Sequence, residues 1–466
     1  MNRPVKEVDA ALKDAPDNRN EDKRTNKEGK VSTVFLGSRT RLALVAALAL
    51  VLVVPAAASA RTKASAGSAA SCQLSVFSWW TGGGEAAGLT KLIASWNKSN
   101  PTCQFKNETV AGGAGSNAKA VLAQRLSAHK PPDSFQGHAG KELQDYIKAG
   151  QVEPIDFIYK QYGLSKIMPK QLISQITYKG HLYSVPVNIH RANVLWYNPA
   201  VLKKAGITSV PKTWAQFIAA LDKAKASGVI PLALGEQWTQ KHLFETVLIS
   251  TLGPSGWNKL WTKGGNWNSA GVKTAIDRFN TLLTDYTNSD AGSLTWQDAG
   301  KLVADGKAAF NIMGDWQDGY FSGSTKGGNL ALKPGKAYKW AAVPGTDGVY
   351  DWLSDSFTLP KGAPHRAAAI KWLGFLGSEK AQDMFNPVKG SIPARQDAKT
   401  SLYGPYLKWA LQQWKTDKLV GSLTHGVVAS NAWNAAVDSA LGLFVQGHDT
   451  ASFQKALVSA HAKNAS

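Results

Sequence analysis

Two adjacent tryptophans, three glycines and a glutamate form the segment of this chain with the clearest chemical potential. It reads F-S-W-W-T-G-G-G-E from Phe77 to Glu85. A Trp face stacks well on the C–H face of a pyranose ring, and a carboxylate accepts hydrogen bonds from hydroxyl groups. Packing tryptophans and a Glu that complements a helix dipole would give the same pattern. Because successive side chains of a strand point to opposite faces, Trp79 and Trp80 cannot both be core, and we expect at least one to face a cleft.

Signatures of catalytic and metal centres are missing from the sequence. It contains no H-E-x-x-H, no G-x-S-x-G and no G-x-x-x-x-G-K-[ST] motif. Its 9 His residues are scattered without metal-ligand spacing. A G-G-x-G cluster at 112–115 precedes a predicted helix and could bind an anion, but an ordinary turn explains it better. The motifs alone therefore point to no enzyme class, and we expect no cofactor and no metal.

The composition indicates a folded protein of more than one domain. The chain has 466 residues, of which 44% are hydrophobic and 18% charged, so it can bury a core. Two cysteines exclude a disulfide-rich scaffold. The formal net charge of +20 would by itself suggest a nucleic-acid partner. No basic block is interleaved with aromatic residues, so we predict an ordinary solvated surface and no nucleic acid.

The first 60 residues are typical of an export signal. An apolar run from Leu42 to Val54 follows basic residues and precedes Ala58-Ser59-Ala60, which predicts a signal peptide cleaved near Ala60. An uncleaved anchor helix is the alternative. Translation starts at Met1 or, as the polar stretch before the run suggests, near Val31. Cys72 follows a poor lipobox, which leaves lipid anchoring open, and the predicted location is extracellular or periplasmic.

After a small-residue linker at 61–71 the pattern alternates between strands and helices. The spacing predicts strands at 74–78, 104–110 and 133–136 and helices at 85–97 and 118–129. Such βαβ units build a parallel sheet, and ligands bind beyond the carboxyl ends of its strands. Cys72 and Cys103 stand at the starts of two of these strands. If those strands pair in parallel, we expect a disulfide, which persists in an oxidising compartment, with two separate buried thiols as the alternative.

Segments spread from Cys72 to Lys455 resemble the extracellular solute-binding proteins of sugar ABC transporters, in particular the glucose/mannose-binding type. The segments are F-S-W-W-T-G-G-G-E (77–85), F-Q-G-H-A-G (135–140), Y-S-V-P-V-N-I-H-R-A-N-V-L-W-Y-N (183–198), G-E-Q-W-T-Q (235–240), N-I-M-G-D-W (311–316), L-S-D-S-F (353–357), F-N-P-V-K-G-S-I-P-A-R (385–395) and S-L-T-H-G (422–426). Any one of these segments alone would be weak evidence for the family, whereas all eight in the order that the family shows are specific evidence.

The resemblance implies a type II periplasmic-binding-protein fold, in which two α/β lobes are joined by a hinge and the ligand lies in the cleft between them. It places the N-terminal lobe at 72–186 and 360–397 and the C-terminal lobe at 187–359 and 398–466. The ligand-binding side chains that it implies are Trp79, Trp80, Glu85, His138, Trp296, Trp316, Asp355, Lys389 and His425. Relatives vary at the position of His138. Asn188, His190 and Trp238 have either a structural or a cleft-lining role.

By the same resemblance the chain is a monomeric receptor that closes on a monosaccharide and presents it to the permease subunits of an ABC importer. Glucose is the first choice, with mannose or galactose as alternatives. A secreted glycoside hydrolase that uses Glu85 and Asp355 as its carboxyl pair is the rival from another class. A wall-polysaccharide-binding lectin that uses the basic surface is a second rival.

Overall fold

The structure is a computed structural model, and it describes residues 72–112 and 115–465. The predicted signal peptide, the linker at 61–71 and the two middle residues of the 112–115 glycine cluster lie outside the described residues. The described residues form one compact unit. Within its described part, two larger sheets, a three-stranded sheet and a short hairpin carry the strands.

The first sheet has five strands in the order β2-β1-β3-β13-β6. Its strands are β1 (Cys72–Ser78), β2 (Cys103–Thr109), β3 (Ser134–His138), β13 (Asp355–Thr358) and β6 (Ser184–Pro186). The first three are mutually parallel, whereas β13 is antiparallel to both of its neighbours. Helices α1 (Gly83–Ser99) and α2 (Ser116–Ser127) connect the parallel strands. The predicted βαβ units and parallel sheet are therefore confirmed for the first part of the chain.

The parallel pairing of β1 and β2 places Cys72 directly opposite Cys103. Their Cα atoms are 4.4 Å apart, and the two residues form a disulfide, as predicted. No free cysteine remains among the described residues.

Reduction of this disulfide is expected to lower the melting temperature of the protein. Its cysteines are separated by 31 residues in sequence, and closing a loop of that length stabilises a fold by roughly 3–4 kcal/mol in the chain-entropy model. Thermal melts with and without reductant measure the shift. Thiol titration of denatured, unreduced protein should find essentially no reactive thiol, and two thiols per chain would contradict the pairing.

Residues 183–198 contain three short strands, each in a different sheet. β6 closes the edge of the first sheet, β7 (His190–Arg191) pairs with β12 (Val349–Leu353), and β8 (Val194–Tyr197) enters a four-stranded sheet. Pro186, which lacks an N–H donor, ends the first piece. The chain crosses from one sheet to the next within a dozen residues here, and it returns through β12 and β13.

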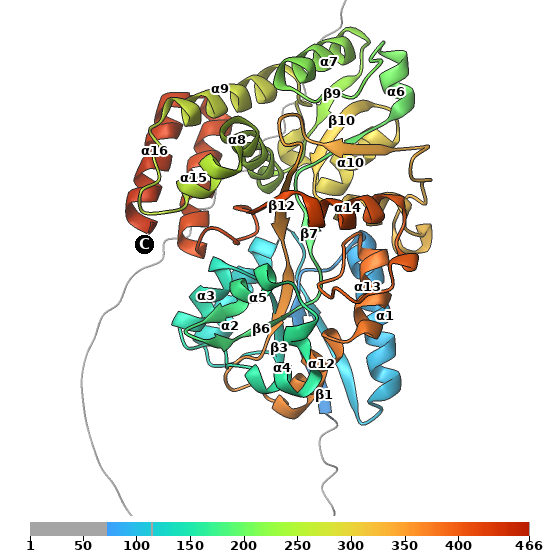
Figure 1. Cartoon of the computed structure of the whole chain (residues 1–466), viewed down its shortest axis with the longest axis vertical. Coiled ribbons are helices and arrows are strands. Elements are labelled where there is room, and N and C mark those ends of the chain that lie inside the picture. The colour runs from blue at the N-terminus through green and yellow to red at the C-terminus, as the bar shows by residue number, and fades with distance from the viewer. Residues whose placement is uncertain (1–71, 113–114, 466) are drawn as a thin grey trace, which may run out of the picture. The chain divides into compact units, whose positions relative to one another are not determined.

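The four-stranded sheet has the order β11-β8-β10-β9. Its other strands are β9 (Ile230–Ala233), β10 (Ala308–Met313) and β11 (Lys339–Ala342), and β14 (Lys418–Gly421) completes the three-stranded sheet β14-β12-β7. A hairpin joins β4 (Thr177–Tyr178) to β5 (His181–Leu182). Figure 1 shows the first sheet in the lower half of the compact unit and the helices α6 to α9 in the upper half, with β7 and β12 between them.

The remaining helices divide between the two halves. Figure 1 shows five of them in the lower half, with the first sheet: α3 (Lys141–Lys148), α4 (Asp156–Tyr162), α5 (Lys170–Ile176), α12 (Arg366–Leu376) and α13 (Glu379–Lys389). The others are α6 (Pro199–Lys204), α7 (Trp214–Ala226), α8 (Gln237–Leu260), α9 (Ala270–Asp285), α10 (Trp296–Ala304), α11 (Trp316–Ser322), α14 (Pro405–Thr416), α15 (Asn431–Gly447) and α16 (Thr450–Asn464). Local sequence fixes several starts: Thr213 with Gln216 caps α7, and Thr295 with Asp298 caps α10.

Two large hydrophobic cores lie under these layers. One surrounds the first sheet and includes Leu74, Phe135 and Phe357, and the other includes Phe244, Phe279 and Phe310. Most of the chain's tryptophans pack in these cores, among them Trp196, Trp257 and Trp372, each at most 1% exposed.

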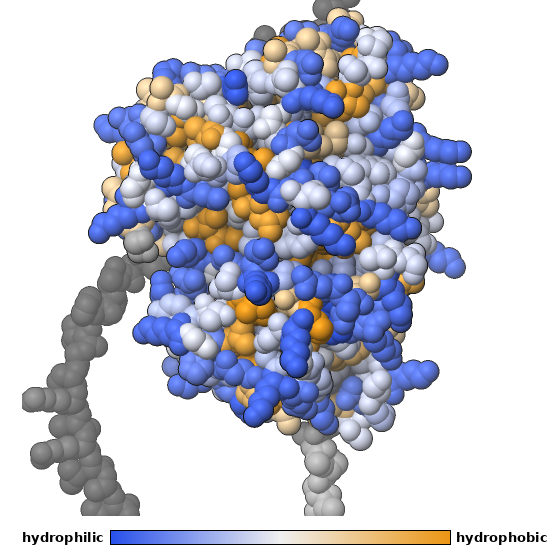
Figure 2. All heavy atoms as spheres, viewed as in Figure 1, coloured by the Kyte–Doolittle hydropathy of each residue, from blue (hydrophilic) through white to orange (hydrophobic). Residues whose placement is uncertain are grey.

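Hydrophilic side chains cover most of the visible face of the molecule, and the apolar ones form separate small areas (Figure 2). Among the described residues, no helix has both the length and the apolar character that a membrane crossing requires.

Candidate functional site

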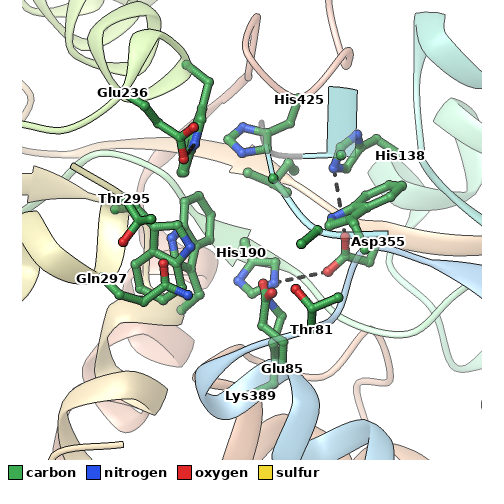
Figure 3. A pocket seen from close by; sticks show the side chains of 18 residues that line it. Thr81, Glu85, His138, His190, Glu236, Thr295, Gln297, Asp355, Lys389 and His425 are labelled. Carbon is green, nitrogen blue, oxygen red and sulfur yellow. Dashed lines mark hydrogen bonds and ion pairs between the residues drawn. The ribbon is translucent and has the colours of Figure 1, made fainter. Parts of the chain in front are cut away.

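A cavity of about 220 Å³ lies where the carboxyl ends of β1 and β3 meet residues from the other half of the molecule. This is the edge at which α/β sheets hold their ligands. Figure 3 shows Glu85 and Lys389 on one side of it, Glu236, Thr295 and Gln297 on another, and His138 and His425 together above Asp355. The walls therefore come from segments that are up to 346 residues apart in sequence, from Trp79 to His425.

Eight of the nine residues implied by the resemblance line this cavity. They are Trp79, Glu85, His138, Trp296, Trp316, Asp355, Lys389 and His425. Contact of these side chains with a ligand stays a prediction, but the structure brings all eight together around one space.

Trp80 does not line the cavity, so the prediction that it belongs to the site is wrong. Its side chain is 1% exposed and packs against Phe357 and Phe385, with ring centroids 5.3 and 4.5 Å away. Strand geometry explains the result, because Trp79 and Trp80 point to opposite sides of the chain. Trp79 takes the cavity side and Trp80 the core side.

Asp355 stands at the first position of β13, on the floor of the cavity, and is 3% exposed. Its Oδ1 accepts a hydrogen bond from Gln136 Nε2 at 2.8 Å. Its Oδ2 accepts one from Asn188 Nδ2 at 2.7 Å and lies 3.2 Å from His190 Nε2. Asn188 and His190, whose roles the sequence left open, thus orient this carboxylate, and His190 also lines the cavity.

Electrostatics keeps the Asp355 carboxylate ionised. Burial would raise its pKa, but the hydrogen bond from His190 and the charge of Lys389 lower it more, so the pKa lies well below its ordinary value. His190 is itself held between carboxylates: burial would lower its pKa, whereas Asp315 on its Nδ1 side raises it. The cavity floor therefore offers a fixed anionic acceptor.

Glu85 and Lys389 form the second charged pair of the cavity. Lys389 Nζ lies 2.6 Å from Glu85 Oε1 and 5.7 Å from the centre of the Trp316 ring. Glu85 sits in the first turn of α1, and Lys389 is the last residue of α13. The pair presents an acceptor and a donor side by side, which is the arrangement that neighbouring hydroxyl groups of one ligand require.

Two histidines complete the polar lining. His138 Nδ1 donates to Glu142 Oε2 at 2.8 Å, and Lys119 Nζ binds the same oxygen at 2.8 Å. Burial would raise the pKa of Glu142, but the charges of Lys119 and His138 lower it to about 2. Burial, reinforced by His138 and His242, lowers the pKa of His425 well below its ordinary value, so this imidazole is neutral.

Aromatic rings form the apolar part of the lining. The tryptophans among the lining residues are Trp79, Trp238, Trp296 and Trp316. Trp316 lies 5.2 Å from the ring of His425 and 6.2 Å from that of Trp238. Trp238, left open by the sequence, is fixed by a 2.9 Å hydrogen bond from its Nε1 to Glu236.

Four polar lining residues were missed by sequence reasoning: Thr81, Glu236, Thr295 and Gln297. Thr81 and Glu236 lie in the family-like segments 77–85 and 235–240, so the resemblance could have identified them. Thr295 and Gln297 flank Trp296 at the start of α10, where Thr295 caps the helix, and no sequence signal marked either of them as a lining residue.

Fold and cavity together define a receptor for a small polar molecule, since tryptophan faces and paired donors and acceptors surround one space between α/β layers. Residues 80–383 match the family described as bacterial extracellular solute-binding protein. The chain belongs to this family.

Known relatives cover most of the chain. It is 38% identical over 382 residues to an uncharacterized ABC transporter extracellular-binding protein of Pyrococcus horikoshii, which covers 81% of this chain and 84% of the relative. It is 34% identical to a probable sugar-binding periplasmic protein of Mesorhizobium japonicum (82% and 91% covered). It is 29% identical to the xylose/arabinose-binding protein XacG of Haloferax volcanii (81% and 82% covered).

The fold also matches solved structures. The solute receptor AcbH, described as exclusively preferring β-D-galactopyranose, superposes with a TM-score of 0.72 at 21% identity, covering 84% of this chain and 98% of that one. The predicted fold, two α/β lobes with the ligand cleft between them, is confirmed. The residue boundaries of the two lobes stay a prediction.

Proposed function

We propose that this protein is the secreted receptor of an ABC import system and binds one monosaccharide, with glucose as the first choice and mannose or galactose as alternatives. The observation that carries the proposal is the cavity itself, where tryptophan faces alternate with the ionised Asp355, the Glu85–Lys389 pair and two histidines. A pyranose presents both apolar C–H faces and a ring of hydroxyl groups, and each finds a partner in this lining.

The size of the cavity favours a single sugar ring. About 220 Å³ is below the ~300–1,000 Å³ of pockets that hold drug-sized molecules, which are larger than one hexose. The binding of pentoses by the Haloferax relative makes xylose and arabinose the closest competitors. In this proposal the protein is a monomer, and its closed, sugar-loaded form delivers the sugar to the permease. Its predicted lobes comprise residues 72–186 with 360–397 and residues 187–359 with 398–466.

A glycoside hydrolase is disfavoured by the carboxyl groups. Hydrolysis needs one carboxylic acid whose raised pKa lets it protonate the leaving group. The pKa of Asp355 is shifted in the opposite direction, and Glu85 is in an ion pair with Lys389. We expect no release of nitrophenol from nitrophenyl glycosides.

Calorimetric titration of the mature protein with a panel of sugars tests the proposal. One hexose is expected to bind one per chain, with micromolar or tighter affinity, and to change the tryptophan fluorescence, because four tryptophans line the cavity. The panel contains glucose, mannose, galactose, xylose, arabinose, two disaccharides and a soluble wall polysaccharide. Tighter binding of a pentose would replace the hexose assignment. Equal binding of the polysaccharide would favour the lectin. If no sugar of the panel binds, the proposal of a sugar receptor is refuted.

A further inference from the structure

Two fully buried carboxyl groups lie behind the cavity wall, outside the residues that line it. Glu245 is on α8 and Asp351 is on β12, and each is 0% exposed. Asp351 lies on the same strand face as the lining residue Leu353, two positions further along. Glu245 follows Trp238 and His242 at helical spacing, so one face of α8 leads from the cavity to the carboxyl pair.

The hydrogen bonding of this pair is incomplete without an added proton. Both oxygens of Asp351 and Oε1 of Glu245 have no donor among the residues that the structure describes. The two side chains are nevertheless within hydrogen-bonding contact of each other. A hydrogen bond between two carboxyl groups requires that one of them carry a proton, because ionised carboxylates only accept.

The other oxygen of Glu245 holds a segment of the cavity wall. Glu245 Oε2 accepts a hydrogen bond from the backbone N–H of Thr424 at 2.6 Å. Thr424 precedes His425, which lines the cavity and whose Nδ1 lies 2.9 Å from Ser422 Oγ in the same turn. Glu245 thus holds, through one hydrogen bond, the backbone next to His425.

We propose that Glu245 and Asp351 share one proton, and that this pair positions His425 against the bound sugar. The positioning part rests on the proposed function, whereas the shared proton does not. Glu245 and Asp351 are positioning residues, since neither lines the cavity.

The surroundings of the pair are consistent with one negative charge and not two. The charged and titratable groups that face it are Arg191 on β7 and His242 and Lys241 on α8, with His425 beyond Thr424. Arg191 is engaged with Asp417, and burial lowers the pKa values of His242 and Lys241. Burial, and next the charge of Glu245, raises the pKa of Asp351 well above its ordinary value.

The test of the shared proton needs no sugar and uses the Asp351→Asn variant, whose amide donates where the acid would. A raised pKa in the folded state means that folding binds a proton, so this contribution to stability is complete below the unfolded pKa of about 4 and is lost as pH rises toward the folded pKa. The unfolding equilibrium constant of wild type, divided by that of the variant, is expected to rise about tenfold per pH unit between pH 5 and 7. Asp277→Asn, on the exposed surface of α9, is the control for loss of one carboxylate.

Sugar binding tests the positioning role. Asp351→Asn is expected to bind within about twofold of wild type at pH 7, whereas Asp351→Ala, which leaves Glu245 without a donor, is expected to bind about tenfold more weakly. If the ratio of the unfolding constants does not change with pH, the two carboxyl groups do not share a proton. A cation that bridged two ionised carboxylates would give this flat result. Unchanged binding by Asp351→Ala would overturn the positioning role. Failure of wild type to bind any sugar refutes the proposed function, and with it the positioning role, while the stability ratio still decides the shared proton.

Discussion

The Asp355→Ala variant is expected to bind the sugar about 10- to 150-fold more weakly than wild type. A hydrogen bond to a charged group contributes about 1.5–3 kcal/mol, and tenfold in affinity corresponds to about 1.4 kcal/mol. The carboxylate is already oriented by Gln136, Asn188 and His190, so a sugar hydroxyl meets a fixed acceptor. Calorimetric titration with the best sugar of the panel measures the loss.

Asp133→Ala is the matched control for this variant. Asp133 is also fully buried and accepts a hydrogen bond from Ser75 N–H at 2.8 Å, but it does not line the cavity. The Asp133→Ala variant should be less stable than wild type and should bind the sugar with unchanged affinity. If Asp355→Ala binds as tightly as wild type, or if the two aspartate variants weaken binding equally, the assigned site is wrong.

The adjacent tryptophans are expected to respond in opposite ways to truncation. Trp80→Ala opens a void beside Phe357 and Phe385 and should lower the free energy of unfolding by about 3–5 kcal/mol, with little change in sugar affinity. Trp79→Ala removes a ring face from the cavity and should weaken sugar binding by about tenfold or more, since burial of a large apolar side chain contributes about 1.5–3 kcal/mol.

Urea unfolding and sugar titration of both variants provide the comparison, and each variant is the control for the other. The assignment of Trp79 to the cavity and Trp80 to the core would be contradicted if Trp80→Ala proved the weaker sugar binder and Trp79→Ala the less stable protein. Residues on the aromatic cavity wall other than Trp79 are not altered in either variant, so fluorescence of the remaining tryptophans still reports binding.

Local pattern was sufficient to predict the first part of the fold. The strands that begin near Cys72 and Cys103, the helix between them and the disulfide all follow from hydrophobic spacing and from the parallel pairing that such spacing implies. The three strands within 183–198 could not be placed in the same way, because period-2 spacing shows that a segment is extended but does not show which partner each piece pairs with.

The candidate site shows the same division. Alternation along a strand predicted that at least one of Trp79 and Trp80 would face a cleft, but not which one, since the two residues are of the same type. Glu245 and Asp351 carried no signal at all, because a buried carboxyl pair arises only when α8 and β12 meet across more than 100 residues of sequence.

The place of β13 in the first sheet has a consequence for the order in which the chain can fold. This strand, residues 355–358, lies between β3 at 134–138 and β6 at 184–186 and is the only link between them in that sheet. Pairing over such a sequence distance is slow, because a long loop must close before the contact forms. While the chain is being made, the first sheet therefore stays in two unjoined pieces until about residue 358 has been added. For a member of an extracellular family, this delay means that the newly made chain reaches three quarters of its length before the two pieces can be joined.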